Sequence, residues 1–349
     1  MKHTLTTLLV LVVSSPAVFA ESLTFTPPAD QANGKHVVLL AGDEEYRSEE
    51  ALPMLGKILS QRHGFKCTVV FSLSADGEAY YIDPNNQQGL SGLDVLKSAD
   101  LMIVSLRFRQ PAETEAAEIT AYLNAGKPVI GLRTSTHAFK GKGAFGRIPY
   151  QAFGRKIMGE GWVKHHGRHK VQGARGVINE DQADHPILNS VSDVFAPSDV
   201  YTVIHLTEAD RVLLKGAVTE TLAPNSKVLD GKINEPMQPL AWIHSWTSPD
   251  GQTTGKTFCT TTGAAVDFVN EDLRRMVVNA SCYLTGLDVP KKANVDYVDA
   301  YYPSFFGFVR DKGHYRKLNR KPSDFDLGKT PHVADPQGTP VWLFRDKPE

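Results

Sequence analysis

Four short apolar runs separated by helical stretches constrain the fold of this chain more than any other feature. The runs are rich in β-branched residues and span 36–41, 67–71, 101–105 and 129–132. Each run is continuously apolar rather than alternating, which is typical of strands covered on both faces. Leu52, Leu55 and Leu59 repeat at helical spacing after the first run, and a similar helical pattern precedes the fourth. These strand–helix–strand units predict an α/β fold with a doubly wound, mostly parallel sheet.

The second half of the chain is predicted to complete the same sheet. Glycines interrupt the sequence between about 138 and 170, where we expect a long loop region. Further strands are predicted at 200–205, 211–218, 240–243 and 257–261, followed by a helix over 270–285 that Gly286 closes. Residues 21–289 are therefore expected to form one domain. Residues 290–349 are rich in charge, proline and aromatic residues without periodicity, and are predicted to be a tail that packs on that domain.

The first twenty residues have the features of a secretory signal peptide. Basic Lys2 is followed by an apolar run over 8–13 and by Ala20 at the expected cleavage point. That run is shorter than the roughly 20 apolar residues of a membrane helix, and no second run approaches this length. We therefore expect an exported protein, periplasmic or secreted, with no membrane span. A formal net charge of −1 argues against nucleic acid as a partner.

Ligands bind at the carboxyl ends of the strands in open parallel α/β sheets, and this rule selects the first candidate residues. The first strand is followed by a carboxylate-rich segment in which Glu44, Glu45 and Arg47 lie nearest the strand. Such carboxylates suit a general base or a metal ligand, or alternatively complement a helix N-terminus. Arg107 follows the third strand and suits either a polar ligand or a neighbouring carboxylate.

The turn after the fourth strand lies where amidotransferases and α/β hydrolases carry their nucleophile. Ser135 in this turn has Arg133 and His137 two residues away on either side, whereas a nucleophile elbow requires small residues there. The three cysteines lie in predicted strands or a helix, at Cys67, Cys259 and Cys282. A serine hydrolase and a glutamine amidotransferase working through a thioester are therefore not expected.

Three histidines within five residues make 162–169 the most informative loop. His165, His166 and His169 suit proton transfer near neutral pH or metal binding through a neutral ring nitrogen. Their spacing matches no standard zinc signature, and Gly167 disfavours a helix that would place His165 and His169 on one face. Two interpretations stay open: a divalent metal held by these histidines, or histidines that hydrogen-bond to a ligand or to solvent.

Taken as a set, these motifs resemble the ThuA-like (trehalose-utilisation) family. The similar segments are 42–49, 126–129, 131–139, 162–167 and 185–187, in the family's order. The resemblance covers about residues 35 to 286 and implies a flavodoxin-like three-layer sandwich of the class I glutamine amidotransferase type, without the nucleophilic cysteine. Asp199 and Tyr201 stand where such domains often carry an acidic residue and a tyrosine. The family name implies a link to disaccharide metabolism through 3-keto sugars.

We therefore expect an enzyme of carbohydrate catabolism that acts on a sugar or keto-sugar, of isomerase, lyase or hydrolase type. The catalytic candidates are Glu45, His137 and His166, with Glu45 or His166 removing a proton next to a carbonyl. Arg133 or a bound metal would stabilise the resulting oxyanion. The residues expected to contact substrate are Glu44, Arg47, Arg107, Arg133, Thr134, Ser135, Trp162, Asp199 and Tyr201. The alternative is a non-catalytic carbohydrate-binding or scaffold protein of the cell envelope.

Overall fold

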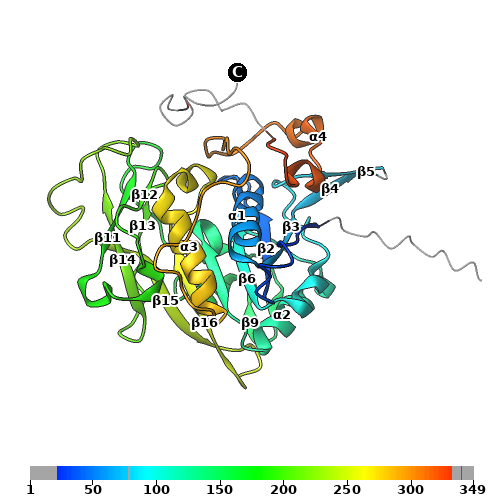
Figure 1. Cartoon of the computed structure of the whole chain (residues 1–349), viewed down its shortest axis with the longest axis horizontal. Helices are drawn as coiled ribbons and strands as arrows, with labels where there is room; N and C mark the ends of the chain where they lie inside the picture. Colours follow the sequence, from blue (N-terminus) through cyan, green and yellow to red (C-terminus); the bar gives the residue numbers. More distant parts are fainter. Residues whose placement is uncertain (1–21, 78, 332–338, 340–349) are drawn as a thin grey trace, which may run out of the picture.

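The computed structural model describes residues 22–77, 79–331 and 339, so the predicted signal peptide lies outside the described residues. One ten-stranded sheet runs through the molecule (Figure 1), in the strand order β1-β3-β2-β6-β7-β16-β15-β14-β11-β12. In this order the strands are Leu23–Phe25, Lys66–Phe71, His36–Gly42, Leu101–Leu106, Val129–Leu132, Thr254–Thr260, Gln238–Thr247, Arg211–Val218, Ala174–Ile178 and Phe195–Ala196.

The sheet has a parallel half and an antiparallel half. Strands β3, β2, β6, β7 and β16 pair in parallel, as predicted from the first four apolar runs. From β16 onward, β15, β14, β11 and β12 pair antiparallel, so the expectation of a mostly parallel sheet does not extend to this half. The physical reason is clearest between β15 and β16, because the short turn over 248–253 can join only antiparallel neighbours.

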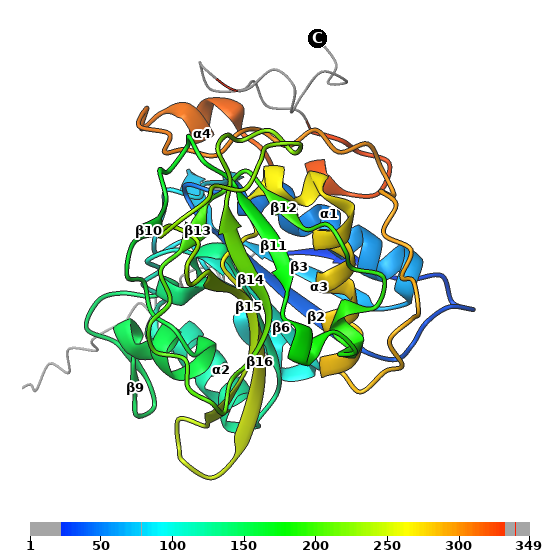
Figure 2. The same ribbon diagram turned by 90° about the vertical axis from the view of Figure 1, so that its left-hand side faces the viewer.

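Helices cover both faces of the parallel half, which gives three layers (Figures 1 and 2). Helices α1 (Ser48–His63) and α3 (Glu271–Leu284) share one core with Val37 and Leu39 of β2. Helix α2 (Glu113–Asn124) and the 3-10 helix η1 (Leu93–Ser98) share the other core with Val38 and Leu40. Because neighbouring residues of a strand point to opposite faces, the continuous apolar run of β2 supplies both cores.

Short elements fill the remaining connections. They are β4 (Leu73–Asp76), β5 (Ala79–Ile82), η2 (Arg133–His137), β8 (Ala144–Phe145), β9 (Ile148–Pro149), η3 (Tyr150–Ala152), η4 (Gly154–Met158), β10 (His165–His166), η5 (Glu180–Gln182), η6 (Pro186–Leu188), β13 (Val200–Tyr201), η7 (Ala265–Val269), α4 (His314–Leu318) and η8 (Pro322–Phe325). The ribbon of β10 and β13 matters most for the site, because it pairs His165 with Tyr201 and His166 with Val200. No helix within the described residues is long and apolar enough to cross a membrane.

Among the described residues beyond Pro290, the segment 299–307 lies along α1 and the loop that precedes it. Lys57 of α1 forms an ion pair of 2.5 Å with Asp299, and the hydroxyl of Ser304 lies 2.6 Å from a carboxylate oxygen of Glu50. Phe305 and Phe306 are buried in a small apolar cluster with Tyr46. The tail therefore reaches the loop that follows β2.

Candidate functional site

The loops at the carboxyl ends of the parallel strands converge and carry unusual backbone conformations. Arg47 follows β2, Phe108 follows β6 and Arg133 follows β7, with φ values of 59°, 51° and 46°. Positive φ in a residue other than glycine is strained, and such residues cluster at functional sites where the surrounding structure holds them in place. The backbone thus points to the same sheet edge that the sequence selected.

Asp43 fixes the loop after β2. This fully buried carboxylate accepts hydrogen bonds from the backbone N–H groups of Glu45 (2.7 Å) and Tyr46 (3.0 Å), and the Thr134 hydroxyl donates to its other oxygen. Burial, and next the charge of Glu44, raises the pKa of Asp43 to about 6. Asp43 therefore ties this loop to η2. The sequence analysis did not select it, since a run of adjacent carboxylates does not reveal which one is buried.

Glu44 forms ion pairs with two arginines. Its Oε1 lies 2.6 Å from Nη1 of Arg107, and its Oε2 lies 2.7 Å from Nη2 of the fully buried Arg109. Glu45 is less engaged, because its Oε2 lies 3.9 Å from Nε of Arg107. Of the two carboxylates, Glu45 is the one available for proton transfer.

Asp199 contacts two histidines of the loop 162–169. One of its oxygens pairs with Arg133, while the other, Oδ2, lies 2.8 Å from Nδ1 of His165 and 3.0 Å from Nδ1 of His169. The two imidazole rings stack with centroids 4.1 Å apart, and Nε2 of His169 lies 3.4 Å from Oε1 of Glu45. The chain thus brings two histidines and two carboxylates into direct contact.

The charges within this cluster shift the pKa values of Asp199 and His169. Burial raises the pKa of Asp199, but the charge of Arg133 and the contacts with His165 and His169 outweigh burial and hold that pKa well below its usual range. Burial lowers the pKa of His169, but hydrogen bonds to Asp199 and Glu45 outweigh it and leave the pKa raised. Asp199 is therefore ionised, and its surroundings favour a positive charge on His169.

Arg133 supports this cluster from inside the protein, where it pairs with Asp199. Its side chain is fully buried between the rings of Tyr46 and Tyr201, with Cζ 4.5 Å and 3.9 Å from their centroids. Its Nη1 donates to the carbonyl oxygens of Asp199 (2.6 Å) and Thr261 (2.7 Å). Its guanidinium is therefore largely bonded to protein groups, and contact of Arg133 with substrate or an oxyanion stays a prediction.

His137 and Trp162 form an aromatic wall beside the cluster. The His137 ring lies between Phe108 and Trp162, with centroids 5.1 Å and 5.0 Å away. Burial, and next the charges of Arg107 and Arg133, lowers the pKa of His137 well below its usual value, so this imidazole is neutral. Trp162 is 38% exposed and also contacts His165, which makes it a surface that a ligand in solution can reach.

Four predicted residues lie away from the cluster. His166 directs Nε2 to the carbonyl oxygen of Ile233 at 2.6 Å, because neighbouring residues of β10 point to opposite sides. Arg47 is buried with Nε 3.2 Å from the Ser304 hydroxyl, and Thr134 bonds to Asp43. Ser135 is buried and faces the core, since a Cβ on Gly131 would lie 2.7 Å from its Oγ. Arg47, Thr134 and Ser135 are thus bonded or packed within the protein, and their contact with substrate stays a prediction. Asp199, rather than His166, lies beside His165 and His169.

The tail supplies a wall that the sequence analysis did not place at the site. The Phe306 ring lies 5.2 Å from the ring of Tyr46 and 5.5 Å from that of His169. The N–H of Gly307 donates to the carbonyl oxygen of Glu45 at 2.8 Å, and Phe308, 46% exposed, lies 4.8 Å from Cζ of Arg107. The aromatic run over 301–306 was the available signal, but it does not indicate which surface it covers.

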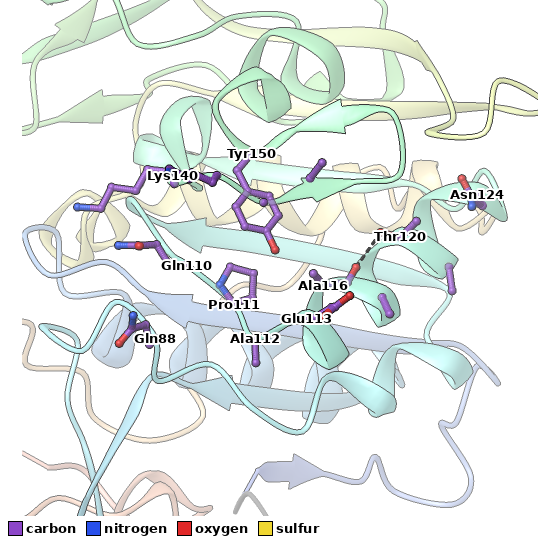
Figure 3. Close-up of a pocket in the computed structure, with 16 residues that line it drawn as sticks. Gln88, Gln110, Pro111, Ala112, Glu113, Ala116, Thr120, Asn124, Lys140 and Tyr150 are labelled. Atoms are coloured by element: carbon purple, nitrogen blue, oxygen red, sulfur yellow. Dashed lines mark hydrogen bonds between the residues drawn. The ribbon is translucent and has the colours of Figure 1, made fainter.

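An open cavity of about 1040 Å³ adjoins the site along α2 (Figure 3). It is lined in part by carboxamides and by an aromatic ring, among them Gln88, Gln110 and Tyr150. Gln110 hydrogen-bonds through its N–H to the carbonyl oxygen of Gln87 (2.8 Å), and the Gln87 carboxamide lies 3.4 Å from Glu44. The Gln87 side chain therefore lies between this cavity and Glu44.

No protein-family model and no curated protein matches the chain. A solved ThuA-like protein from Parabacteroides merdae ATCC 43184 is 14% identical, with a TM-score of 0.47 over 80% of this chain and 99% of that chain. The mmIFT52 N-terminal domain is 11% identical, with a TM-score of 0.39 over 73% and 100% of the two chains. The cytoplasmic protein STM3548 from Salmonella typhimurium is 10% identical, with a TM-score of 0.40 over 73% and 100%. Likenesses this distant assign neither a family nor an activity.

Proposed function

We propose that this protein is an exported ThuA-like enzyme that transfers a proton next to the carbonyl group of a sugar or keto-sugar. The observation that carries the proposal is the contact between Glu45 and His169, one of the two histidines held by Asp199. A base beside a group that favours positive charge is what enolisation of a ketone requires. The motifs that resemble the ThuA-like family, and the amidotransferase-type fold which that resemblance implies, support the choice of substrate.

The proposed step uses Glu45 as the base. Its carboxylate takes the proton from the carbon next to the carbonyl, the C–H electron pair forms a C=C bond, and the carbonyl oxygen becomes an oxyanion. His165 and His169 face that oxyanion and stabilise its charge. Return of the proton to a neighbouring carbon gives isomerisation, and loss of a β-substituent gives elimination.

Two features support a sugar as the ligand. Exposed aromatic rings lie beside residues of the site, Trp162 against His165 and Phe308 against Arg107. The adjoining cavity offers the carboxamides of Gln88 and Gln110 and the ring of Tyr150. Ring faces and neutral hydrogen-bonding groups are what a carbohydrate requires, and the cavity leaves room for a second sugar unit.

The test is proton exchange. The chain without residues 1–20 is incubated in D2O with a disaccharide and with its 3-keto form, and proton NMR follows deuterium entry next to the carbonyl. Glu45→Gln is expected to reduce the exchange rate by roughly 10²–10⁴-fold, the usual range for a general base. His166→Ala is the matched control and should exchange at nearly the wild-type rate, since His166 points to Ile233.

Two outcomes would overturn the proposal. Binding of the keto-disaccharide without exchange, both with and without added divalent metal, would favour the non-catalytic carbohydrate-binding protein. Exchange that Glu45→Gln leaves at the wild-type rate would exclude Glu45 as the base.

A further inference from the structure

Asp199 presents one carboxylate oxygen to two imidazole nitrogens, which hydrogen bonding alone explains only in part. Nδ1 of His169 forms a hydrogen bond of 3.0 Å with Oδ2. Nδ1 of His165 lies closer, at 2.8 Å, yet it is buried and lacks a hydrogen bond of acceptable geometry among the described residues. Its direction therefore does not fit the carboxylate as its partner.

The spacing of these three atoms fits the ligands of a metal ion. Metal bonds of about 2.0–2.1 Å to imidazole and carboxylate place adjacent ligand atoms roughly 2.9–3.4 Å apart. The two separations to Asp199 Oδ2, 2.8 Å and 3.0 Å, agree with this spacing, and one ligand atom from each of the three residues lies within 4.8 Å of the others.

Groups around the three residues orient them as metal ligands are usually oriented. Arg133 pairs with the other oxygen of Asp199 and leaves Oδ2 facing the histidines. Nε2 of His169 is buried and lies 3.4 Å from Oε1 of Glu45 without forming a hydrogen bond to any described residue, so Glu45 is within reach of a proton on Nε2 that would leave Nδ1 free to bind metal. A carboxylate behind a ligating histidine is the common arrangement that fixes its tautomer.

The rings of the two histidines reach the surface, although Nδ1 of His165 is itself buried. His165 is 30% exposed and His169 is 22% exposed, whereas Asp199 is fully buried. Three protein ligands with an accessible remaining position are typical of a catalytic rather than a structural site. Two imidazoles and one carboxylate suit a first-row divalent ion such as Zn²⁺, and not Ca²⁺ or Mg²⁺.

We infer that His165, His169 and Asp199 bind one divalent transition-metal ion, with Glu45 orienting His169 from behind. When bound, the ion would stabilise the oxyanion in place of the two imidazoles, a role in turnover that rests on the proposed function. Metal binding itself is measured without any substrate, so failure of one proposal is distinguishable from failure of the other.

The experiment measures metal content. The chain without residues 1–20 is stripped with a chelator, loaded with Zn²⁺, desalted and analysed for bound zinc, and Co²⁺ is loaded in parallel to record its visible spectrum. Wild type should retain one equivalent of either ion, with a Co²⁺ spectrum typical of nitrogen and oxygen ligands. His165→Ala and His169→Ala should each retain less than a tenth of an equivalent, and both side chains are exposed enough to be removed without unfolding the chain.

His166→Ala is the matched control, because it removes an imidazole from the same two-residue strand on the side facing Ile233. It should retain the wild-type equivalent, and Glu45→Gln should weaken zinc affinity by roughly 10–100-fold. Equal zinc content in wild type, His165→Ala and His169→Ala would overturn the inference. Loss of zinc in His166→Ala alone would overturn it too, since the ligands would then be other histidines.

Discussion

The candidate site consists of two layers that carry similar residue types for different purposes. The inner layer comprises Asp43, Arg109, Arg133 and Asp199, all fully buried and bonded to backbone or to one another. The outer layer comprises His165, His169, Trp162, Arg107 and Phe308, which are partly exposed. The difference shows that charge at a strand end is no evidence of ligand contact, because the inner charges hold loops in place and the outer groups reach solvent.

The largest effect is expected from Arg133→Met, which breaks the inner layer. The change leaves the Asp199 carboxylate buried without its guanidinium partner, and removing one member of a buried pair costs about 3–5 kcal/mol. Urea unfolding measures the loss. In the outer layer, Arg107→Met should cost about 1 kcal/mol, since that guanidinium is partly exposed. Equal losses for the two changes would contradict the division into layers.

Phe306→Ala is expected to have the next largest effect on stability. It tests whether the tail stabilises the domain as the inner layer does. The ring is buried against Tyr46 and His169, and removing a buried phenylalanine costs about 3 kcal/mol. Phe308→Ala, two residues away and 46% exposed, is the matched control and should cost less than about 1 kcal/mol. Thermal unfolding of both variants is the measurement. A stable Phe306→Ala protein would mean that the tail packs without stabilising the domain.

The sequence predicts the parallel half of the sheet well, because continuous apolar runs and helical spacing are local signals. Strand β7 has the predicted bounds, and the predicted β14 matches Arg211–Val218. Pairing direction in the second half is not local, because it depends on the turn lengths between strands and on where each strand returns to the sheet.

The sequence predicts which strand ends form the site, but not which side chains face one another there. The sequence places His165 and His166 side by side, and only the pairing of β10 with β13 decides that His165 faces Asp199. The burial of Arg133 depends on Tyr46 and Tyr201, which come from two distant segments. The position of Phe306 depends on a contact across most of the chain. Each of these contacts joins residues that are far apart in the sequence, so neither composition nor local spacing predicts it.

Glu49→Gln is expected to change how stability depends on pH. Burial raises the pKa of Glu49 to about 8 from an ordinary value of 4.5, against the opposing charge of Arg47. Between about pH 4.5 and pH 8 the unfolded chain loses this proton while the folded chain keeps it, so stability falls as pH rises through that window. The variant should flatten this decline, measured by urea unfolding at pH 5, 6.5 and 8.

The control for that experiment is Glu113→Gln, which changes an exposed carboxylate in the first turn of α2. It should leave the pH profile of stability parallel to that of wild type. A profile for Glu49→Gln that still declines like wild type would show that another group causes the loss.

The smallest effect on stability is expected from Trp162→Ala, which acts on the outer layer alone. The indole is 38% exposed, so its removal should cost less than about 1 kcal/mol. The same ring contacts His137, His165 and Tyr201, and it forms the face on which the proposed sugar would stack. Binding of a keto-disaccharide, measured by calorimetry, should therefore weaken by about 10-fold or more, while Trp162→Phe keeps most of the affinity. Unchanged affinity in Trp162→Ala would show that the sugar does not stack on Trp162. Phe308 would then be the remaining exposed ring of the site on which it could stack.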